Sequence, residues 1–399
     1  MRALSWLLIA AFTAILLLPL AQMRFHFLHE TELRGVTLET RRPSWAFAGW
    51  WSGTFQKDFE AWFDENLGFR GYFIKIDNQV GYSVFHDASS KAVDRPVLGL
   101  KGMLYEEAYV QALNGSAIPA EADLAALAAR LRRLEDAFAA RDIPFVFVVS
   151  PSKAALYPEY VRPEFLLPKA RRLPTTYERF VRELQREGVR YVDGHAILAR
   201  EKARGAPLLY PPGGIHWSTY GAHFVVRAIW SEFEKQLARP LVMLRCDSLS
   251  LDARPLPGGV EPDETDMERL LNAVKIDHGG WKYAHPTLVS DSTANTFRPR
   301  LLLVGDSFGW QLTRILARQE MVATIDYYYY FKKHWRITSP SPKPAAMPPR
   351  RVDWDKDVFS ADAILLEVNE IQIDSTGCGF VDQALARLAN DPGAARVRR

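Results

Sequence analysis

Four short apolar runs constrain the fold of this chain more than any other feature of its sequence. They are residues 143–149 (IPFVFVV), 189–193 (VRYVD), 301–304 (LLLV) and 363–368 (AILLEV). The first run lies between Asp142 and Ser150, which is typical of a buried parallel strand. Apolar residues that recur every three or four positions, as in the leucines between 124 and 134, predict helices between the runs. This alternation predicts an α/β fold with a parallel sheet covered by helices on both faces.

The N-terminus carries a long apolar segment. No charged residue stands between Arg2 and Arg24, and residues 4–21 read LSWLLIAAFTAILLLPLA, close to the ~20 apolar residues that cross a bilayer as a helix. A cleaved signal peptide has a shorter apolar region and small residues around its cleavage site, whereas Pro19 and Ala21 flank the only candidate. We therefore expect residues 1–24 to be an inner-membrane signal anchor with a periplasmic body, with a cleaved signal and a soluble periplasmic protein as the alternative.

The composition excludes several classes of protein and cofactor. A net charge of +3, from 50 basic and 47 acidic residues in 399, argues against a nucleic-acid-binding protein. The two cysteines, Cys246 and Cys378, exclude a disulfide framework but leave one bridge open outside the cytoplasm. The sequence has neither a metal-ligand spacing of His, Cys and Asp nor a Gly-rich phosphate-binding motif, so we expect no metal and no nucleotide cofactor.

The body after the apolar segment divides into an extension and a larger domain. In residues 25–100, aromatic side chains recur at helical spacing from Trp51 to Phe63, before a stop at Gly68, which predicts a helix packed through one face. We expect this extension to pack on the core, and residues 101–399 to form the α/β domain. Two segments of that domain, the polar residues 246–296 and the Pro-rich residues 339–351, are predicted to be irregular solvated loops.

The sharpest chemical signal is the sequence RLLLVGDSFGWQL, in which a strand ends in Gly305-Asp306-Ser307 and runs into a predicted helix. A serine at a strand-to-helix turn lies at the carboxyl edge of the sheet, where open α/β sheets bind ligands. Its hydroxyl is exposed beside a helix N-terminus, whose amide groups stabilise a developing oxyanion. Helix capping by Ser307 or Asp306 is the alternative explanation of the same residues.

A second motif supplies a base for this serine. His216 stands in GGIHWSTYGAHFVVRAIW, directly before a helix capped by Ser218 or Thr219. An imidazole on a loop at the sheet edge is suited to acid–base chemistry, although a single histidine beside a tryptophan is more often a packed structural residue. The serine and histidine motifs together favour catalysis over both structural explanations.

These motifs, in this order, resemble those of the alginate O-acetyltransferase family, whose members are periplasmic or membrane-anchored proteins with an SGNH-hydrolase-like domain. The segments that carry the resemblance are GTFQKDFEAWFDENLGFR, VLGLKGMLY, VVSPSKAALYP, IHWSTYGA, VGDSF and ILLEVNE. They span nearly the whole chain and are most similar to the alginate acetylation proteins of the J type, which are related to the X type. The resemblance implies that Ser307 is the acetylated nucleophile and His216 its general base.

The sequence departs from this family at one important position. In the family, the histidine base stands in the motif Asp-x-His-Trp. Here Gly214 stands two residues before His216, so the carboxylate that orients the imidazole is missing. Removal of that function from a serine triad lowers turnover on the order of 10⁴-fold. Three explanations stay open: another carboxylate such as Glu367 or Glu370 replaces it, the protein is a slow Ser/His dyad, or it has lost catalysis and kept binding.

Other positions are candidates for supporting the site or contacting a substrate. Lys153 follows a predicted strand, so we expect its ammonium either to contact an anionic sugar or a phosphate, or to be solvated. Asn369 and Glu370 follow the last strand, where side chains either face a ligand or form a turn. Asp306 and Trp217 stand next to the nucleophile and the base.

The sequence therefore predicts a periplasmic polysaccharide O-acetyltransferase that modifies an alginate-type exopolysaccharide through an acetyl-serine intermediate. Because acetyl-CoA is a cytoplasmic compound, the resemblance implies a multi-spanning membrane-bound O-acyltransferase as partner and acetyl donor. An acetylesterase would use the same residues with water as the acceptor. The alternative from another class is a catalytically impaired polysaccharide-binding or scaffold subunit of an exopolysaccharide acetylation and export complex, which Gly214 favours.

Overall fold

The computed structural model describes residues 2–30, 33–35, 40–88, 95–116, 118–168, 171–256, 262–277, 279–291 and 296–390. The chain divides into two compact units. The first comprises Met1–Leu98 and Met267–Asp277, and the second comprises Gly99–Asp266 and His278–Arg399. The predicted domain boundaries at residues 24 and 100, and the predicted packing of residues 25–100 on the core, stay predictions.

The first unit begins with the apolar helix α1 (Arg2–Phe25). Its segment Leu4–Phe25 has a mean hydropathy of 2.3, and its apolar window is not buried by the rest of the chain. A helix of this length and composition is a signal sequence or a membrane anchor. The Gln22 side chain closes the end of α1, because its amide donates to the Leu28 carbonyl (2.7 Å) and accepts the Leu28 N–H (3.1 Å).

The described part of this unit continues with three helices, a π-helical turn and a strand. They are α2 (Phe47–Ser52), α3 (Thr54–Asn66), α4 (Arg70–Val80), the turn Gly81–Phe85 and β1 (Pro96–Leu98). The helix predicted from the aromatic repeat is confirmed as α3 from Phe55 on, whereas Trp51 lies in the separate helix α2, which ends at the left-handed Gly53. The prediction that one face of it is packed is wrong, because none of its residues, all of them described, is buried. Its rings instead stack along the helix surface, with the Phe59 ring centre 6.0 Å from those of Phe55 and Phe63.

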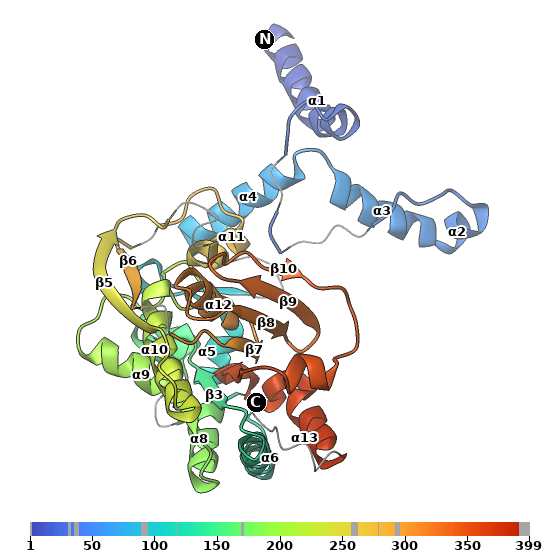
Figure 1. The fold of residues 1–399 in the computed structure, drawn as a ribbon. Helices are drawn as coiled ribbons and strands as arrows, with labels where there is room; N and C mark the ends of the chain where they lie inside the picture. Colours follow the sequence, from blue (N-terminus) through green and yellow to red (C-terminus); the bar gives the residue numbers. More distant parts are fainter. Residues whose placement is uncertain are drawn as a thin grey trace. The chain divides into compact units, whose positions relative to one another are not determined.

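The second unit is built on a sheet that has seven strands within the described residues, in the order β10-β9-β8-β7-β11-β3-β4. They are β3 (Phe145–Ser150), β4 (Tyr191–Asp193), β7 (Arg300–Gly305), β8 (Thr324–Tyr329), β9 (Lys333–Thr338), β10 (Ala345–Ala346) and β11 (Ala363–Asn369). The strands from β8 to β4 are parallel, and β9 and β10 continue the sheet antiparallel beside β8, as Figure 1 shows for β7, β8 and β9. All four strands predicted from the apolar runs are present, so the α/β fold is confirmed.

Helices cover both faces of this sheet, as predicted. One face carries α6 (Glu121–Ala139), α8 (Thr176–Arg186) and α13 (Phe380–Asn390), and the other carries α9 (Gly194–Ala203), α10 (Thr219–Leu237) and α12 (Gly309–Arg318). Alternate residues of a strand serve the two faces: Phe145, Phe147 and Val149 of β3 pack with the first group, while Val146 and Val148 are buried toward the second. The short elements β2 (Leu104–Glu106) and α5 (Glu107–Leu113) precede α6, and α7 (Lys153–Leu156) follows β3 directly.

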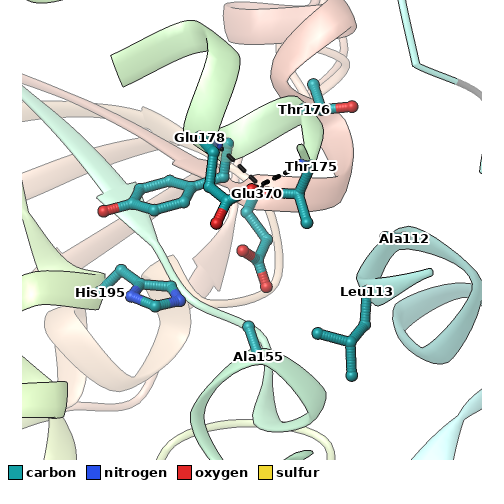
Figure 2. A pocket seen from close by; sticks show the side chains of 9 residues that line it. Ala112, Leu113, Ala155, Thr175, Thr176, Glu178, His195 and Glu370 are labelled. Carbon is teal, nitrogen blue, oxygen red and sulfur yellow. Dashed lines mark hydrogen bonds between the residues drawn. The ribbon is translucent and has the colours of Figure 1, made fainter. Parts of the chain in front are cut away.

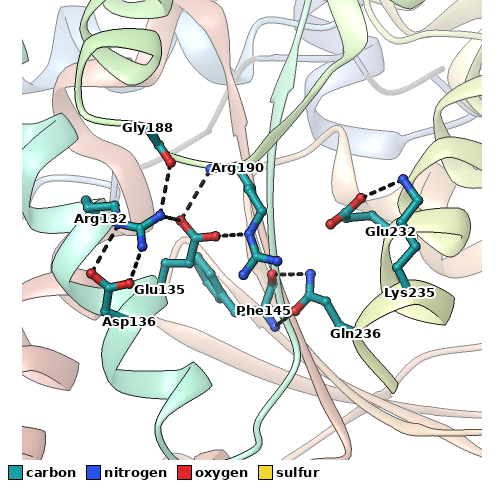
Figure 3. A network of polar contacts seen from close by, with 9 residues as sticks. All are labelled: Arg132, Glu135, Asp136, Phe145, Gly188, Arg190, Glu232, Lys235 and Gln236. Carbon is teal, nitrogen blue, oxygen red and sulfur yellow. Dashed lines mark hydrogen bonds and ion pairs between the residues drawn. The ribbon is translucent and has the colours of Figure 1, made fainter. Parts of the chain in front are cut away.

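Polar groups at the margin of the core are paired within the protein (Figure 3). The buried carboxylate of Glu135 in α6 lies between the guanidinium groups of Arg132 (3.2 Å) and Arg190. The Gln236 side chain of α10 pairs with the Phe145 backbone, accepting its N–H (2.9 Å) and donating to its C=O (3.0 Å). At the start of β3, which β4 does not pair with, this amide makes the backbone hydrogen bonds that a neighbouring strand would make.

The prediction of an irregular loop over residues 246–296 is wrong. This segment contains most of an antiparallel hairpin of β5 (Met243–Asp252) and β6 (Tyr283–Asp291), and between them a 3₁₀ turn (Pro262–Thr265) and α11 (Asp266–Leu271). Most side chains of β5 are exposed, so the strand lacks the apolar alternation by which strands are found in a sequence. The Pro-rich residues 339–351 include the two-residue strand β10 and are otherwise irregular, as predicted. The thiols of Cys246 in β5 and Cys378 after β11 are both free.

Candidate active site

Ser307 lies on a tight turn between β7 and α12. Asp306, which is buried, fixes this turn, because its Oδ1 accepts the Phe308 N–H (3.0 Å) and its Oδ2 accepts the Asn369 N–H (2.6 Å) at the end of β11. The Tyr327 hydroxyl of β8 donates to the Asp306 carbonyl. Burial raises the pKa of the Asp306 carboxyl, and its two backbone N–H partners oppose that shift. Asp306 therefore joins the Ser307 turn to the strands on either side of β7.

The backbone before this turn is packed against a second buried carboxyl group. A Cβ on Gly305 would lie 2.8 Å from a carboxylate oxygen of Glu367, so the close approach requires glycine. Glu367 accepts the Ser150 hydroxyl (2.7 Å) and the Asp306 N–H (3.2 Å). Burial raises the pKa of Glu367 well above its usual range, and the negative charge of Asp306 raises it further. Glu367 is therefore a structural group beneath the turn.

His216 meets Ser307 from the loop that precedes α10. Its Nε2 lies 2.8 Å from Ser307 Oγ, and its ring packs against Phe308 with ring centres 4.9 Å apart. Its Nδ1 lies 2.9 Å from Oδ2 of Asp266. Since an ionised carboxylate only accepts hydrogen bonds, Nδ1 carries a proton and donates it to Asp266, which leaves Nε2 to accept the serine hydroxyl. The three side chains are arranged in the order in which a serine triad places its nucleophile, base and orienting acid.

Asp266 is the functional residue that the sequence patterns miss. It is the first residue of α11 and stands 50 residues after His216 in the chain. Its Oδ1 accepts the Ile215 N–H (2.7 Å), so one carboxylate holds both the imidazole and the backbone beside it. The turn before Asp266 is fixed by Glu264, a buried carboxylate 3.2 Å from the His285 ring of β6. The only signal in the sequence is that this polar segment is rich in carboxylates.

The two carboxylates considered from the sequence as replacements for the missing acid are used elsewhere. Glu367 binds Ser150 and the backbone of Asp306, and Oε1 of Glu370 accepts the Ser152 N–H (2.8 Å). Both stand at or just after the end of β11, so they face the neighbouring strands β7 and β3. The prediction that either one orients His216 is therefore corrected in favour of Asp266.

Lys153 is buried (1% exposed) and faces neither a substrate nor solvent. Its ammonium donates to the carbonyl oxygens of Pro211 (3.0 Å), Pro212 (2.9 Å) and Gly214. The prediction that Lys153 contacts a substrate or water is wrong, because these carbonyls close over it and occupy the three N–H donors of its ammonium. They belong to the loop that carries His216, so Lys153 holds the base in place from the end of β3.

Trp217 and Asn369 support the site from inside the core. The Trp217 ring is buried, lies 5.3 Å from the Phe308 ring and donates from Nε1 to the Phe308 carbonyl (3.3 Å). Asn369 is buried too, donates from Nδ2 to the Ser150 carbonyl (3.3 Å) and accepts the Ile371 N–H (3.2 Å). Both side chains are used within the protein, so they position the site and do not extend toward a ligand.

Most amide groups near the nucleophile are used within its turn. The Phe308 N–H is bound by the Asp306 side chain, and the N–H groups of Gly309 and Trp310 donate to the carbonyls of Asp306 (3.1 Å) and Ser307 (3.4 Å). Among the hydrogen bonds of the described residues, none uses the Ser307 N–H. This amide therefore remains for an oxyanion that develops beside the N-terminal end of α12.

Tyr330 is a further side chain at the nucleophile that the sequence patterns do not connect with catalysis. Its N–H donates to the Gly305 carbonyl (2.8 Å), at the start of the Ser307 turn. Burial raises the pKa of its hydroxyl, and hydrogen bonds with Gln372 and Ser307 oppose that shift. A neutral phenol beside the nucleophile is an additional hydrogen-bond donor for the site.

Comparison with known proteins connects this geometry with a family. Residues 98–277 match a family model described as the SGNH hydrolase-like domain of acetyltransferase AlgX. Over this segment, which is less than half of its length, the chain is similar to an SGNH hydrolase-like domain of the AlgX acetyltransferase type. The match includes Lys153, Gly214, His216 and Asp266, whereas Ser307 lies beyond its end. No curated protein sequence matches the chain.

The chain is also similar to several solved structures. One is the O-acetyltransferase domain of Pseudomonas putida AlgJ, with 16% identity over 74% of this chain and 99% of that one and a TM-score of 0.44. Pseudomonas aeruginosa AlgX has 14% identity over 76% of this chain and 68% of its own, with a TM-score of 0.45. Bacillus cereus PatB1 has 12% identity over 70% of this chain and 97% of its own, with a TM-score of 0.39.

Proposed function

We propose that this protein is a polysaccharide O-acetyltransferase that works through Ser307, His216 and Asp266. The observation that carries the proposal is the row of hydrogen bonds from Ser307 Oγ to His216 Nε2 (2.8 Å) and from His216 Nδ1 to Asp266 Oδ2 (2.9 Å). This arrangement activates a hydroxyl for attack on an acyl carbon. The AlgX-type domain supports an acetyl group as the one that is transferred.

The reaction takes place in two displacements at Ser307. In the first, Ser307 Oγ attacks the carbonyl carbon of an acetyl donor, and His216 Nε2 takes the serine proton and delivers it to the leaving group. In the second, a sugar hydroxyl attacks the acetyl-serine, and His216 takes that hydroxyl proton and returns it to Ser307 Oγ as the ester bond breaks. Asp266 stabilises the imidazolium in both displacements. The Ser307 N–H and the end of α12 stabilise the negative charge of each tetrahedral intermediate.

The acetyl donor has to come from the membrane in this proposal. Helix α1 serves as an inner-membrane anchor, and the rest of the chain lies in the periplasm, where acetyl-CoA is not available. A multi-spanning membrane-bound O-acyltransferase then delivers the acetyl group to Ser307. The acceptor is an exopolysaccharide, and the family resemblance favours a polymer of the alginate type.

A non-catalytic binding or scaffold subunit is the second candidate. Its support is Gly214, which stands two residues before the histidine, at the position where the family has an aspartate. The contact between Asp266 and His216 weakens that support, because an acid reaches the imidazole from another segment. An acetylesterase needs the same three side chains with water as the acceptor, so the products of the reaction separate it from a transferase.

Acetyl release by the purified full chain tests the proposal. The chain is incubated in detergent with an activated acetyl ester, and intact-protein mass spectrometry follows acetylation of the serine. We expect wild type to release acetate and to carry one acetyl group, Ser307→Ala to do neither, and Ser341→Ala, a matched change on a surface loop, to behave as wild type. Equal rates for wild type and Ser307→Ala would support the scaffold instead. Acetylated oligosaccharide among the products identifies a transferase, and free acetate alone identifies an esterase.

A further inference from the structure

A cavity of about 160 Å³ lies in the second unit, apart from the row of Ser307, His216 and Asp266. Figure 2 shows its wall, with the Glu370 carboxyl group between His195 on one side and Leu113 on the other. The described residues that line it are Ala112, Leu113, Ala155, Thr175, Thr176, Tyr177, Glu178, His195 and Glu370. The described lining thus combines a small apolar wall with two carboxyl groups, three hydroxyls and one imidazole.

Glu370 is the central polar group of this cavity. It is 7% exposed, and its Oε1 accepts the Ser152 N–H (2.8 Å). A carboxylate accepts about four hydrogen bonds, so Glu370 keeps acceptor capacity toward the cavity. Burial raises the pKa of Glu370, and the charge of His195 opposes that shift most strongly. A buried acceptor of this kind needs hydrogen-bond donors, which a ligand with hydroxyl groups would provide.

His195 presents a second free polar edge. Its ring stacks on Tyr177, with centres 4.5 Å apart and planes at 15°. The Tyr177 hydroxyl is fixed by Asp193 (2.9 Å), which holds the stacked pair in place. Within the part of the chain that the structure describes, the His195 ring makes no hydrogen bond. Its two nitrogens are therefore available to one donor and one acceptor on a ligand.

The cavity lies on the same edge of the sheet as the nucleophile. Ser307, Glu370, Ser152 and His195 follow the carboxyl ends of β7, β11, β3 and β4, which are neighbours in that order and parallel. Adjacent strands are about 4.8 Å apart, so a polysaccharide bound along this edge would span the distance from Ser307 to the cavity with a few sugar residues. The link is rigid, because Ser152 binds Glu370 and the next residue, Lys153, binds the His216 loop.

The charges of the cavity discriminate between kinds of sugar. Its described lining has the carboxyl groups of Glu178 and Glu370 and the imidazole of His195, and it includes no lysine or arginine. The carboxylate of a uronic acid would lie against these two carboxyl groups with the His195 imidazole as its one possible cationic partner in the described lining, which is unfavourable in a partly buried site. A neutral sugar avoids this cost, satisfies Glu370 with its hydroxyl groups and places its C–H face on Leu113 and the alanines.

We propose that this cavity is a subsite for one neutral, hydroxyl-rich sugar residue of the acceptor polysaccharide. The inference rests on the proposed acetyl transfer at Ser307 and names the class of acceptor that this site takes. It predicts that the acceptor polysaccharide carries an uncharged sugar residue at this position. This restricts the alginate-type substrates that the family resemblance favours to polymers with such a residue.

Direct binding to the full chain tests this subsite without any chemistry. Ser307→Ala protein in a detergent without sugar groups is titrated by calorimetry with neutral tetrasaccharides of glucose, mannose and galactose, with a mannuronate tetramer and with a glucosamine tetramer. We expect at least one neutral tetramer to bind more tightly than both charged ones. Glu370→Gln keeps the Ser152 contact and removes the charge, so it weakens the neutral tetramer about tenfold and reduces the penalty on mannuronate.

Glu187→Gln, directly after the last residue of α8 and outside the described lining of the cavity, is the matched control and leaves every affinity unchanged. His195→Ala weakens the neutral tetramer by a similar factor, with thermal melting as the check that each variant folds. The subsite is excluded if no neutral tetramer binds, if mannuronate or glucosamine binds most tightly, or if Glu370→Gln and His195→Ala leave binding unchanged. The catalytic proposal fails on a different observation, equal acetyl release with and without Ser307, so the two failures are distinguishable.

Discussion

The two sides of the candidate active site are held by different kinds of contact. The Ser307 turn is anchored inside the sheet by Asp306, whose carboxylate binds backbone groups of the turn and of β11. His216 stands on a loop, which the Lys153 ammonium holds from one side and the Asp266 carboxylate from the other. The nucleophile is therefore fixed by the fold itself, whereas the base is fixed by two charged side chains that can change without rebuilding the sheet.

This difference explains how the orienting acid can occupy a new position. Asp266 comes from the segment between β5 and β6, outside the central sheet, and reaches both Nδ1 of His216 and the N–H of Ile215. An acid at position 214 would approach the same imidazole from within the loop. The base requires a carboxylate at Nδ1, and either segment can provide it.

The largest expected effect is on the histidine side. Asp266→Asn keeps the shape of the side chain but cannot hold the imidazole in its productive tautomer, so we expect kcat for acetyl release to fall on the order of 10⁴-fold. Asp247→Asn, a matched change on the exposed surface of β5, should leave kcat within about twofold. Retention of more than a tenth of the wild-type kcat in Asp266→Asn would mean that the protein works as a Ser/His dyad.

A second substitution tests whether the acid can be exchanged. Gly214 has no positive φ, so its backbone accepts an aspartate. We expect Gly214→Asp in the Asp266→Asn background to recover kcat about tenfold or more, because the carboxylate returns to the imidazole from inside the loop. Gly214→Asp alone should bring no gain, since Asp266 already binds Nδ1. A gain in the single variant and none in the double would contradict the role of Asp266.

Removal of the buried ammonium of Lys153 is expected to lower kcat less than the change at Asp266. It tests whether Lys153 acts by positioning the His216 loop. Lys153→Met leaves three carbonyls of the His216 loop without a donor, so we expect the free energy of unfolding to fall by about 3 kcal/mol and kcat to fall more than KM rises. Lys202→Met is the matched control, because Lys202 also binds a carbonyl, that of Leu156, and pairs with Glu159, but does not touch this loop. Urea unfolding and steady-state kinetics measure both quantities; equal changes in the two variants would argue against a positioning role for Lys153.

The smallest expected effect is a pH dependence on the serine side. Burial raises the pKa of Glu367 above its ordinary value of 4.5, so the folded protein holds a proton that the unfolded chain has lost. The free energy of unfolding therefore falls as pH rises above about 4.5, where Glu367 ionises in the unfolded chain before it does in the folded protein. Glu367→Gln removes this contribution and should flatten the dependence, while Glu187→Gln should not. Parallel pH curves for wild type and Glu367→Gln would show that Glu367 is ionised in the folded state.

The sheet and the nucleophile were accessible from the sequence because their signals are local. Each of the four predicted strands is a short, mainly apolar run with a polar residue at or close to its end, and Ser307 follows one such run after Gly305 and Asp306. His216 is accessible for a similar reason, since it directly precedes a helix that Ser218 caps through the Gly221 N–H (3.0 Å). In both cases the residues that define the feature are close together in the chain.

The remaining parts of the site depend on contacts between distant segments. Asp266 reaches His216 from the segment between β5 and β6, and most side chains of β5 are exposed, so no pattern of burial before Asp266 marks it. Lys153 is buried by the loop 211–214, which begins 58 residues further along the chain. The local sequence, a lysine after a strand, does not indicate that a distant loop buries it. Glu370 shares its strand end with Glu367, and only the neighbouring strands decide which way each one faces.

The burial of Lys153 also bears on chemical durability under the proposed function. A protein that handles activated acetyl groups exposes its own amines to acetylation, and an amine reacts only when the acetyl donor can reach it. Lys153 is buried and its ammonium donates to three carbonyl oxygens, so an acetyl donor does not reach it. The loop that carries His216 is thus secured by a group that the proposed acetyl donor cannot modify.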